Sequence, residues 1–283
     1  MILAREESAI TAICAGWRDS GLRTGFVPTM GALHRGHLEL VRRAREISDR
    51  VVVSIFVNPS QFGQGEDLAS YPRTLQEDSR ALEKLGVSAV FAPEAGSVYP
   101  PGFSSRVHVS NVTEGLCGAE RPGHFDGVAT VCAVLFGMIR PHVAVFGRKD
   151  AQQLAMIRRM VRDLRLGVEI EAVPIVREHD GLAMSSRNAY LSKEEREQAP
   201  AVFRGLLAAR ALAEKGEQRC IQLKELFREI VDAMPLLCTQ YVEAVDPDTM
   251  QPVHRVNGQV LLAAAVFAGR TRLIDNVLIE PEV

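Results

Sequence analysis

Residues 24–37 read TGFVPTMGALHRGH and join an apolar segment to a charged, amphipathic one. The apolar run predicts a strand over residues 22–27, and the spacing of apolar side chains predicts a helix over residues 36–48. Between them, Gly31 and Gly36 allow the backbone to turn and to approach a ligand closely. A glycine turn that leads from a strand into a helix is typical of phosphate binding, because a helix N-terminus presents N–H groups and partial positive charge.

Two histidines, His34 and His37, lie three residues apart at the predicted start of this helix. At that spacing they face the same way on a forming helical turn. Two imidazoles there could donate hydrogen bonds to phosphate oxygens and stabilise the charge that grows as a phosphoanhydride breaks. The alternative is a pair of surface histidines at a helix start. A zinc site is disfavoured, because the sequence has no HExxH motif and no nearby third ligand.

The first half of the chain alternates apolar runs with helical patterns, which indicates a parallel sheet with right-handed crossovers. We expect a Rossmann-like, doubly wound α/β domain whose ligands bind at the carboxyl ends of the strands. Further strands are predicted at residues 51–57, 89–92, 143–146 and 168–173, and further helices at residues 75–85, 127–139 and 150–164.

The second half has a different pattern, with two charged helices followed by three short strands. It predicts a second, smaller α+β domain. We expect residues 1–175 to form the nucleotide-binding domain and residues 176–283 to form a lid that closes over the nucleotide. The helices are expected at residues 192–215 and 219–234, and the strands at residues 239–245, 259–267 and 272–279.

Composition favours a protein that acts on small molecules. The 283 residues are 47% hydrophobic, enough for one large core or two modest ones, and the formal net charge is only −2. Such a charge creates no strong field for nucleic acid or an anionic membrane, and no apolar run approaches the ~20 residues of a spanning helix. The five cysteines are scattered, and the N-terminus has no signal-peptide pattern. We therefore expect a reduced, cytoplasmic protein without disulfides or structural zinc.

Several ordered sequence blocks resemble the pantothenate synthetase (pantoate–β-alanine ligase) family, within the HIGH-type nucleotidyltransferase superfamily. The HxGH signature alone points to the superfamily, whereas the longer block PTMGALHRGH is more specific. The remaining blocks are SIFVNPSQF (54–62), YPRTLQED (71–78), RPGHFDGVATV (121–131), FGRKDAQQL (146–154), DGLAMSSRN (180–188) and LIDN (273–276).

This resemblance implies an AMP-forming ligase. Pantoate would react with ATP to give pantoyl adenylate and pyrophosphate, and β-alanine would then displace AMP to give pantothenate. The family also implies Mg²⁺ bound to ATP, a homodimer and no nucleic-acid or membrane partner. Such chemistry needs alignment of reactants and neutralisation of phosphate charge rather than a covalent enzyme intermediate.

The resemblance also implies roles for individual residues. Catalysis would depend on His34, His37, Lys149, Ser186 and Arg187. ATP would be bound by Met30, His34, His37, Gly147, Lys149, Asp150, Val176, Met184, Ser185, Ser186 and Arg187. Pantoate and β-alanine would be bound by Pro28, Met30, Asn58, Gln61, Phe62, Arg121, His124 and Gln153. Asp78 would be the Mg²⁺ ligand.

Each assignment has a simpler alternative in the residues themselves. Asp150 could be an ordinary N-cap, and Asp78 could merely complement a helix dipole. The serines and arginine of DGLAMSSRN could form a polar loop, the amides could be surface groups, and RPGHF could be a linker. The chain also departs from the family pattern, with Arg148 where glutamate is usual and Ala81 at a usually polar position.

Two other functions stay open at this point. One is a small nucleotidyltransferase with a different substrate, which would release pyrophosphate but not AMP. The other is a nucleotide-sensing module without catalysis, whose expected mark is damage to the charged phosphate-binding set. That set is complete here, which favours an enzyme.

Overall fold

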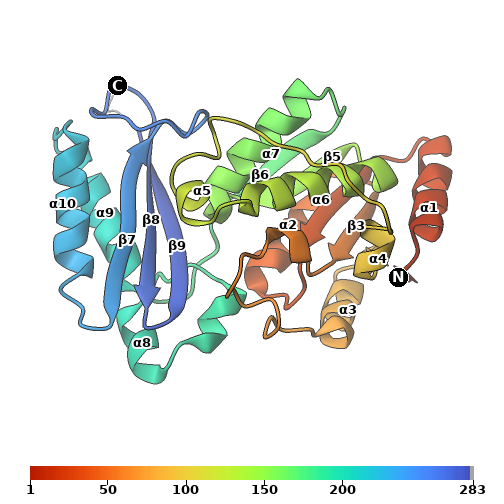
Figure 1. Cartoon of the computed structure of the whole chain (residues 1–283), viewed down its shortest axis with the longest axis horizontal. Coiled ribbons are helices and arrows are strands. Elements are labelled where there is room, and N and C mark those ends of the chain that lie inside the picture. Colours follow the sequence, from red (N-terminus) through yellow and green to blue (C-terminus); the bar gives the residue numbers. More distant parts are fainter. Residues whose placement is uncertain (281–283) are drawn as a thin grey trace. The chain divides into compact units, whose positions relative to one another are not determined.

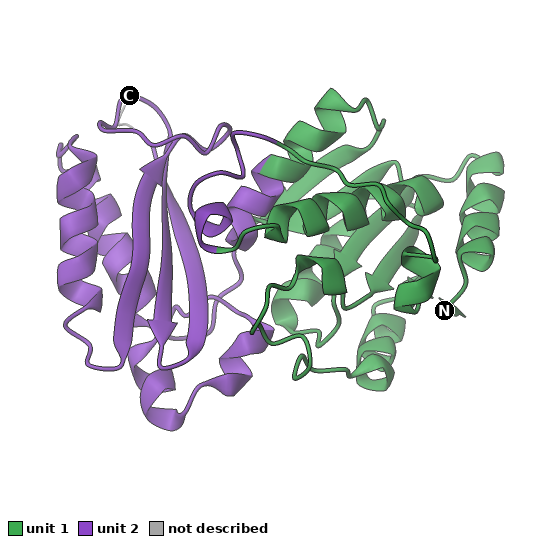
Figure 2. Cartoon of the chain, in the orientation of Figure 1, with its two compact units in different colours: residues 1–109, 121–148, 156–174 green, residues 110–120, 149–155, 175–283 purple. Residues whose placement is uncertain are grey.

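Two sheets organise residues 1–280, the part of the chain that this computed structural model describes (Figure 1). The chain divides into two compact units (Figure 2). Unit 1 comprises residues 1–109, 121–148 and 156–174, and unit 2 comprises residues 110–120, 149–155 and the chain from residue 175 onward. Two short segments of the first half therefore group with unit 2, whereas we expected a single division after residue 175.

Unit 1 contains a six-stranded sheet in the order β1-β4-β3-β2-β5-β6, with every neighbouring pair parallel. This confirms the expected Rossmann-like sheet. The glycine turn, however, follows the second strand of the chain and not the first. The strands are β1 (Ile2–Ala4), β2 (Thr24–Thr29), β3 (Arg50–Ile55), β4 (Ala89–Phe91), β5 (Val143–Gly147) and β6 (Glu169–Val173).

Helices cover both faces of this sheet. Val27 of β2 shares a buried cluster with Val41 of α2 and Leu82 of α3. The preceding residue, Phe26, makes an edge-to-face contact with Phe136 of α6, with ring centroids 6.1 Å apart. Successive side chains of a strand point to opposite faces, so these helices cover opposite faces, as in a doubly wound fold. The helices are α1 (Glu7–Asp19), α2 (Arg35–Ile47), α3 (Leu75–Lys84), α4 (Ala95–Val98), α6 (His124–Ile139) and the 3₁₀ turn η1 (Pro59–Gln61).

The segment after β5 crosses between the units. The 3₁₀ turn η2 (Arg148–Asp150) begins in unit 1 and ends in unit 2, whereas α7 (Ala151–Asp163) begins in unit 2 and ends in unit 1. The short helix α5 (Cys117–Glu120) belongs to unit 2. The chain therefore passes from β5 of unit 1 through η2 into the first turn of α7, which belongs to unit 2.

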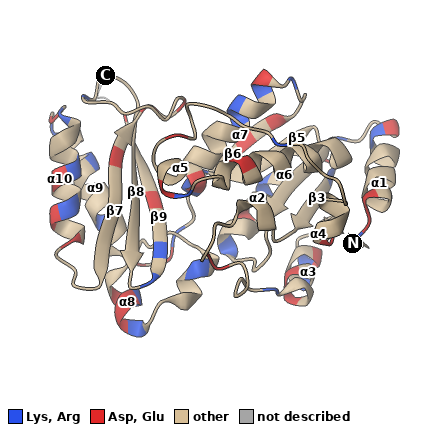
Figure 3. Cartoon of the chain, in the orientation of Figure 1, with Lys and Arg blue, Asp and Glu red and all other residues tan. Residues whose placement is uncertain are grey.

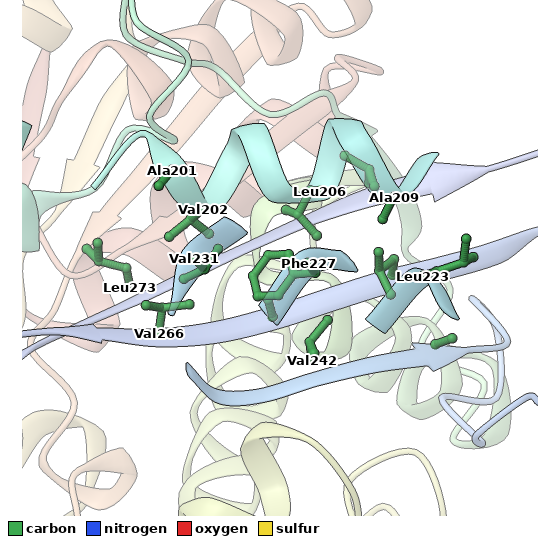
Figure 4. Close-up of a cluster of buried hydrophobic side chains, with 14 of the residues drawn as sticks. Ala201, Val202, Leu206, Ala209, Leu223, Phe227, Val231, Val242, Val266 and Leu273 are labelled. Atoms are coloured by element: carbon green, nitrogen blue, oxygen red, sulfur yellow. The ribbon is translucent and has the colours of Figure 1, made fainter. Parts of the chain in front are cut away.

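Unit 2 contains an antiparallel sheet of β7 (Leu237–Val245), β8 (Val260–Ala268) and β9 (Thr271–Ile279), in that order. The helices α9 (Ala201–Glu214) and α10 (Cys220–Val231) pack on it, and Phe227 lies at the centre of their shared core (Figure 4). The core confirms the expected α+β architecture. A 3₁₀ turn, η3 (Ser186–Tyr190), precedes these helices.

The helix expected over residues 192–215 is two helices, α8 (Lys193–Gln198) and α9. Pro200 lies at the junction as the N-cap residue of α9. Proline lacks the N–H that a continuous helix would need there and its ring clashes with the preceding turn, so the single-helix prediction was wrong.

Acidic and basic residues are interspersed along the ribbon of each unit, without long segments of one sign (Figure 3). This distribution agrees with the small net charge of −2. Among residues 1–280, no helix combines the length and the apolar character needed to cross a bilayer.

Candidate active site

The strand order of unit 1 reverses between β2 and β5, and there the two strands separate. Their registered pairs are Gly25 with Val143 and Phe26 with Ala144, although both strands continue for several residues. Pro28 lies in the part of β2 that still pairs with β3 but no longer with β5, and it lacks the N–H that a further ladder bond to β5 would use. Ligands of open α/β sheets bind at the carboxyl side of such a reversal. Met30 and Gly147 therefore lie at the expected ligand site.

The turn after β2 has an unusual backbone that is held by a buried carboxylate. Gly31 and Ala32 have φ of +83° and +50°, so two successive residues are left-handed. For Ala32 this conformation costs about 1 kcal/mol. Asp78, only 4% exposed, accepts hydrogen bonds from the N–H groups of Ala32 (3.0 Å) and Leu33 (2.9 Å). The carboxylate thus offsets the strain and fixes the turn.

Asp78 does not fit the role of a Mg²⁺ ligand that the family resemblance implied for it. Besides the two backbone N–H groups, its Oδ2 accepts a hydrogen bond from Thr74 Oγ1 at 3.1 Å. A carboxylate with both oxygens engaged in this way offers little to a cation that demands near-ideal octahedral geometry. Within residues 1–280 no group of His, Cys, Asp and Glu side chains is arranged to hold a metal ion.

Replacing Asp78 by alanine is expected to lower the free energy of unfolding by about 2 kcal/mol, because buried N–H groups lose their acceptor. Urea denaturation without nucleotide or Mg²⁺ would measure this loss. Glu77→Ala is the matched control, because Glu77 is the neighbouring acidic residue of the same first turn and is exposed. If the metal-free protein were equally stable with and without Asp78, a structural role for Asp78 would be wrong.

His34 and His37 form a capping box at the start of α2. His34 is the N-cap residue, and its Nδ1 accepts a hydrogen bond from the Gly36 N–H at 3.1 Å. The Nδ1 atom of His37 accepts one from the His34 N–H at 3.4 Å. The imidazole rings are near neighbours, with centroids 4.0 Å apart. Because each Nδ1 is an acceptor, each neutral ring carries its proton on Nε2, away from the backbone.

Backbone N–H groups at this turn are therefore already bonded within the protein, contrary to our expectation of free N–H groups for phosphate. The Gly31 N–H donates to Thr29 Oγ1 at 3.2 Å. The following N–H groups, up to Gly36, include those bound by Asp78 and by the two imidazoles. Gly31 also serves internal packing, because a Cβ atom there would lie 3.2 Å from Asp78 Oδ2. The Nε2–H groups of the two imidazoles are donors that take no part in these backbone hydrogen bonds.

Gln61 lies at the end of η1, where Asn58 orients its side chain. The Nδ2 of Asn58 donates to Gln61 Oε1 at 3.0 Å, and Gln61 Nε2 contacts Met30 Sδ at 3.1 Å. Asn58 is 1% exposed, and its Oδ1 accepts hydrogen bonds from Ser60 and Tyr99. Asn58 thus orients Gln61, and its burial does not fit direct contact with β-alanine.

Two residues hold the main chain of Gln61. They are His124, the first residue of α6, and Arg121, which lies three residues before it. Arg121 Nη1 donates to His124 Nε2 at 3.0 Å, and therefore His124 Nδ1 carries the proton that it donates to the Gln61 carbonyl at 2.8 Å. Arg121 in turn binds both carboxylate oxygens of Glu66, at 2.7 and 2.6 Å. These contacts favour positioning over direct substrate binding for both residues.

Helix α6 and η1 are in direct backbone contact at Gly127. A Cβ atom there would lie 2.3 Å from the Ser60 carbonyl oxygen and 2.7 Å from Gln61 Cα. The Gly127 carbonyl also accepts a hydrogen bond from Asn58 Nδ2 at 3.1 Å. Nearby, Phe62 stacks edge-to-face on Tyr71, with ring centroids 6.0 Å apart. Only glycine permits this approach, so the position of Gln61 depends on it.

The ion pair of Glu66 predicts a pH dependence of stability. Partial burial alone would raise the pKa of Glu66, but hydrogen bonds and charge from Arg121 outweigh it and hold the pKa below its ordinary value. A depressed carboxylate pKa contributes stability above the ordinary pKa, and this is lost as pH falls through the folded-state pKa. We expect the unfolding free energy of Glu66→Gln to fall less steeply than wild type below about pH 4.5. Urea titrations across that range would test this, and parallel curves would contradict it.

In unit 2, Lys149 and Asp150 lie in η2, directly before α7. Lys149 is half-buried, whereas Arg148 and Asp150 are exposed. Asn276 of β9 donates from Nδ2 to the Lys149 carbonyl at 3.0 Å. The exposure of Arg148 is compatible with an arginine at this position, where the family resemblance leads us to expect glutamate.

The DGLAMSSRN segment is a short hairpin that is fixed to β9. The Met184 N–H donates to the Val176 carbonyl at 3.0 Å, and Arg177 forms a bidentate pair with Asp275 at 2.6 and 2.9 Å. Burial raises the pKa of Asp275, against the opposing hydrogen bonds and charge of Arg177. Ser185 then caps η3, accepting a hydrogen bond from the Arg187 N–H at 3.3 Å. The LIDN block thus has a structural function, because its Asp275 holds the hairpin through Arg177. This function was not predicted from the sequence.

The two adjacent glutamines of α7 have different environments. Gln152 is buried and binds the segment 110–120 through the Cys117 N–H and the carbonyls of Val112 and Gly115. Gln153, half-buried, makes no such hydrogen bond within residues 1–280. Gln153 therefore retains an amide that can bind a ligand.

Together, the parallel sheet, its separated strands and the paired imidazoles define an α/β protein of the class that binds its ligand at the carboxyl edge of the sheet. A sequence profile described as Pantoate-beta-alanine ligase matches residues 2–278. Pantothenate synthetase of Heliobacterium modesticaldum is 57% identical over 260 residues, 92% of each chain. That of Syntrophotalea carbinolica is 48% identical over 283 residues, 100% of each chain.

Solved structures agree. The crystal structure of pantothenate synthetase from Thermus thermophilus has a TM-score of 0.93 at 45% identity, covering 99% of this chain and 100% of that one. Pantoate-beta-alanine ligase from Francisella tularensis, complexed with beta-gamma ATP and beta-alanine, has a TM-score of 0.79 at 33% identity, covering 98% and 97%. The chain therefore belongs to the pantoate–β-alanine ligase family and is a ligase of pantothenate biosynthesis.

Proposed function

We propose that this chain condenses pantoate with β-alanine through a pantoyl-adenylate intermediate. A pantoate carboxylate oxygen attacks the α-phosphorus of ATP, and the bond to the bridging oxygen breaks to release pyrophosphate. The β-alanine amine then attacks the acyl carbon and loses a proton, and AMP leaves with the former carboxylate oxygen. The product is pantothenate, and no covalent bond to the protein forms.

The observation that carries this proposal is the capping box of His34 and His37. Hydrogen bonds from the backbone reach both Nδ1 atoms, so each neutral ring carries its proton on Nε2, and an Nε2–H group is a suitable donor to an anion. Preorganised donors of this kind stabilise charge that develops in a transition state. We assign both histidines to the phosphate oxygens on which charge accumulates as pyrophosphate leaves.

Lys149, Ser186 and Arg187 are proposed as further phosphate donors, on the strength of the family resemblance. Lys149 contributes a compact ammonium charge and Arg187 a planar fork of donors, both suited to phosphate. Ser186 adds a hydroxyl donor, and Asp150 can accept from the ribose hydroxyls. Backbone and side-chain atoms of Met30, Gly147, Val176, Met184 and Ser185 complete the proposed ATP site.

Pantoate is proposed to bind through the amides of Gln61 and Gln153. Each amide both donates and accepts, as the hydroxyl and carboxylate groups of pantoate require. Pro28, Met30 and Phe62 offer apolar surface to its gem-dimethyl group. Asn58, Arg121 and His124 act on pantoate through Gln61, as their hydrogen bonds favour.

Mg²⁺ is proposed to enter as the ATP complex, with water and phosphate oxygens as its main ligands. We also propose a homodimer, on the strength of family resemblance. The cysteines of the chain are free thiols, which suits the proposed cytoplasmic location.

A three-substrate assay tests the proposed reaction. AMP release should require ATP, pantoate and β-alanine together, whereas exchange of labelled pyrophosphate into ATP should require pantoate but not β-alanine. A nucleotidyltransferase of another kind would release pyrophosphate without AMP. Exchange that is independent of pantoate would exclude pantoyl adenylate as the intermediate.

A further inference from the structure

Glu66 lies five residues beyond Gln61, in the loop that follows η1, and nothing so far gives it a part in the reaction. Its two carboxylate oxygens accept hydrogen bonds from Nε and Nη2 of Arg121 at 2.7 and 2.6 Å. The side chain of Glu66 is 26% exposed and that of Arg121 is 17% exposed, so this ion pair is partly shielded from water. A bidentate pair of this geometry fixes the plane of the guanidinium group as well as its position.

The position of the Arg121 guanidinium group determines which nitrogen of His124 carries the proton. Arg121 Nη1 has only protons to offer, so the His124 Nε2 that it contacts at 3.0 Å is an acceptor. His124 must then carry its proton on Nδ1, where it donates to the Gln61 carbonyl at 2.8 Å. Without Arg121 in place, the imidazole could adopt the other tautomer, which has no donor for this carbonyl.

Gln61 is thus held from two sides. Asn58 holds its side-chain oxygen, and His124 holds its main-chain oxygen. We propose that Glu66 is a positioning residue for pantoate binding, which acts through Arg121 and His124 on Gln61. The proposal rests on the proposed function, since it takes Gln61 to be a pantoate ligand.

The expected result is selective. Glu66→Ala should raise the KM for pantoate about tenfold, because misplacement of a substrate ligand by a fraction of an ångström weakens binding. The KM for ATP should change less than about twofold, because Met30 is the one proposed ATP ligand within residues 1–280 that contacts this network, and it does so only through the Gln61 side chain. Glu66→Gln, which keeps one acceptor oxygen, should give an intermediate KM. A role confined to stability would leave both KM values unchanged.

A double-mutant cycle tests the route. Arg121→Ala should raise the KM for pantoate, and adding Glu66→Ala should raise it no further, because both changes interrupt one chain of contacts. Glu171→Ala is the matched control. Glu171 pairs with Arg43 in the same unit, at 2.7 Å, and its side chain is 28% exposed. This control should leave the KM for pantoate at the wild-type value.

The outcomes separate the two proposals. If wild type shows no pantoate-dependent pyrophosphate exchange, the proposed function fails. If wild type is active but Glu66→Ala and Glu66→Gln both keep its KM for pantoate, the role of Glu66 is wrong. Additive effects in the double variant would also overturn it, since they would mean that Glu66 does not act through Arg121. Should Glu66→Ala fail to fold, Glu66→Gln and the Arg121 cycle built on it decide the question.

Discussion

The His34→Ala variant is expected to exchange labelled pyrophosphate into ATP about 10²–10³-fold more slowly than wild type, in the presence of pantoate. This is the scale of losing one preorganised donor to developing charge. The imidazole also caps α2 through Nδ1, so alanine removes two functions at once. Its effect on stability must therefore be separated from its effect on the reaction.

The variant His34→Asn separates the effect on stability from the effect on the reaction. Asparagine is a favourable N-cap residue whose side-chain oxygen can accept the Gly36 N–H, but it has no donor at the position of Nε2. We expect near-wild-type thermal stability together with the same loss of exchange as His34→Ala. His37→Gln is the corresponding variant for the second imidazole, because glutamine serves at the third position of a capping box. Full activity in His34→Asn would remove His34 from the mechanism.

Gly127→Ala is expected to cost about 3 kcal/mol of unfolding free energy, at the upper end for an overpacked site. The added methyl group would meet backbone atoms of Ser60 and Gln61, which cannot rotate away as a side chain could. Relief requires η1 to move away from α6, and Gln61 moves with it. We therefore also expect kcat/KM for pantoate to fall about 10²-fold, the cost of a misplacement near 1 Å.

Gly137→Ala is the control within the same helix. Gly137 is exposed on α6, and a Cβ atom there would meet nothing within 4 Å. Alanine is favoured over glycine in a helix interior, so this variant should be stabilised by about 0.5–1 kcal/mol. Urea denaturation and pantoate kinetics on both variants check the prediction. A stable Gly127→Ala with normal kinetics would mean that η1 and α6 adjust without cost.

The sheet of unit 1 could be predicted from sequence because β-branched runs such as residues 51–53 alternate with helical patterns. The edge strand β1 was missed, although β4, with the same number of residues, was predicted. All three residues of β4 are buried, whereas only Ala4 of β1 is. Pro200 was visible in the sequence, and its effect on a helix is known physics. Treating residues 192–215 as one helix gave too much weight to composition and too little to this one residue.

The candidate site was predicted through its sequence blocks, and in the structure His34, His37 and Gln61 follow the carboxyl ends of β2 and β3. Blocks do not show which residue a side chain contacts. Asp78 lies 46 positions from the Ala32 N–H that it binds, and Arg121 lies 55 positions from Glu66. Pairings of that separation depend on the folded chain, so a metal role for Asp78 and a substrate role for Arg121 were natural but incomplete interpretations.

The N–H groups of Gly31, Ala32, Leu33, His34 and Gly36 are bonded within the protein, which has a consequence for how this site can change. In a P-loop the backbone N–H groups themselves bind phosphate, and no single side-chain substitution removes those donors. In the proposed mechanism the phosphate ligands of this turn are instead imidazole side chains, each encoded by one codon, while Asp78 holds the turn beneath them. Point mutation can thus retune or abolish anion affinity without dismantling the scaffold, which leaves this architecture open to functional divergence.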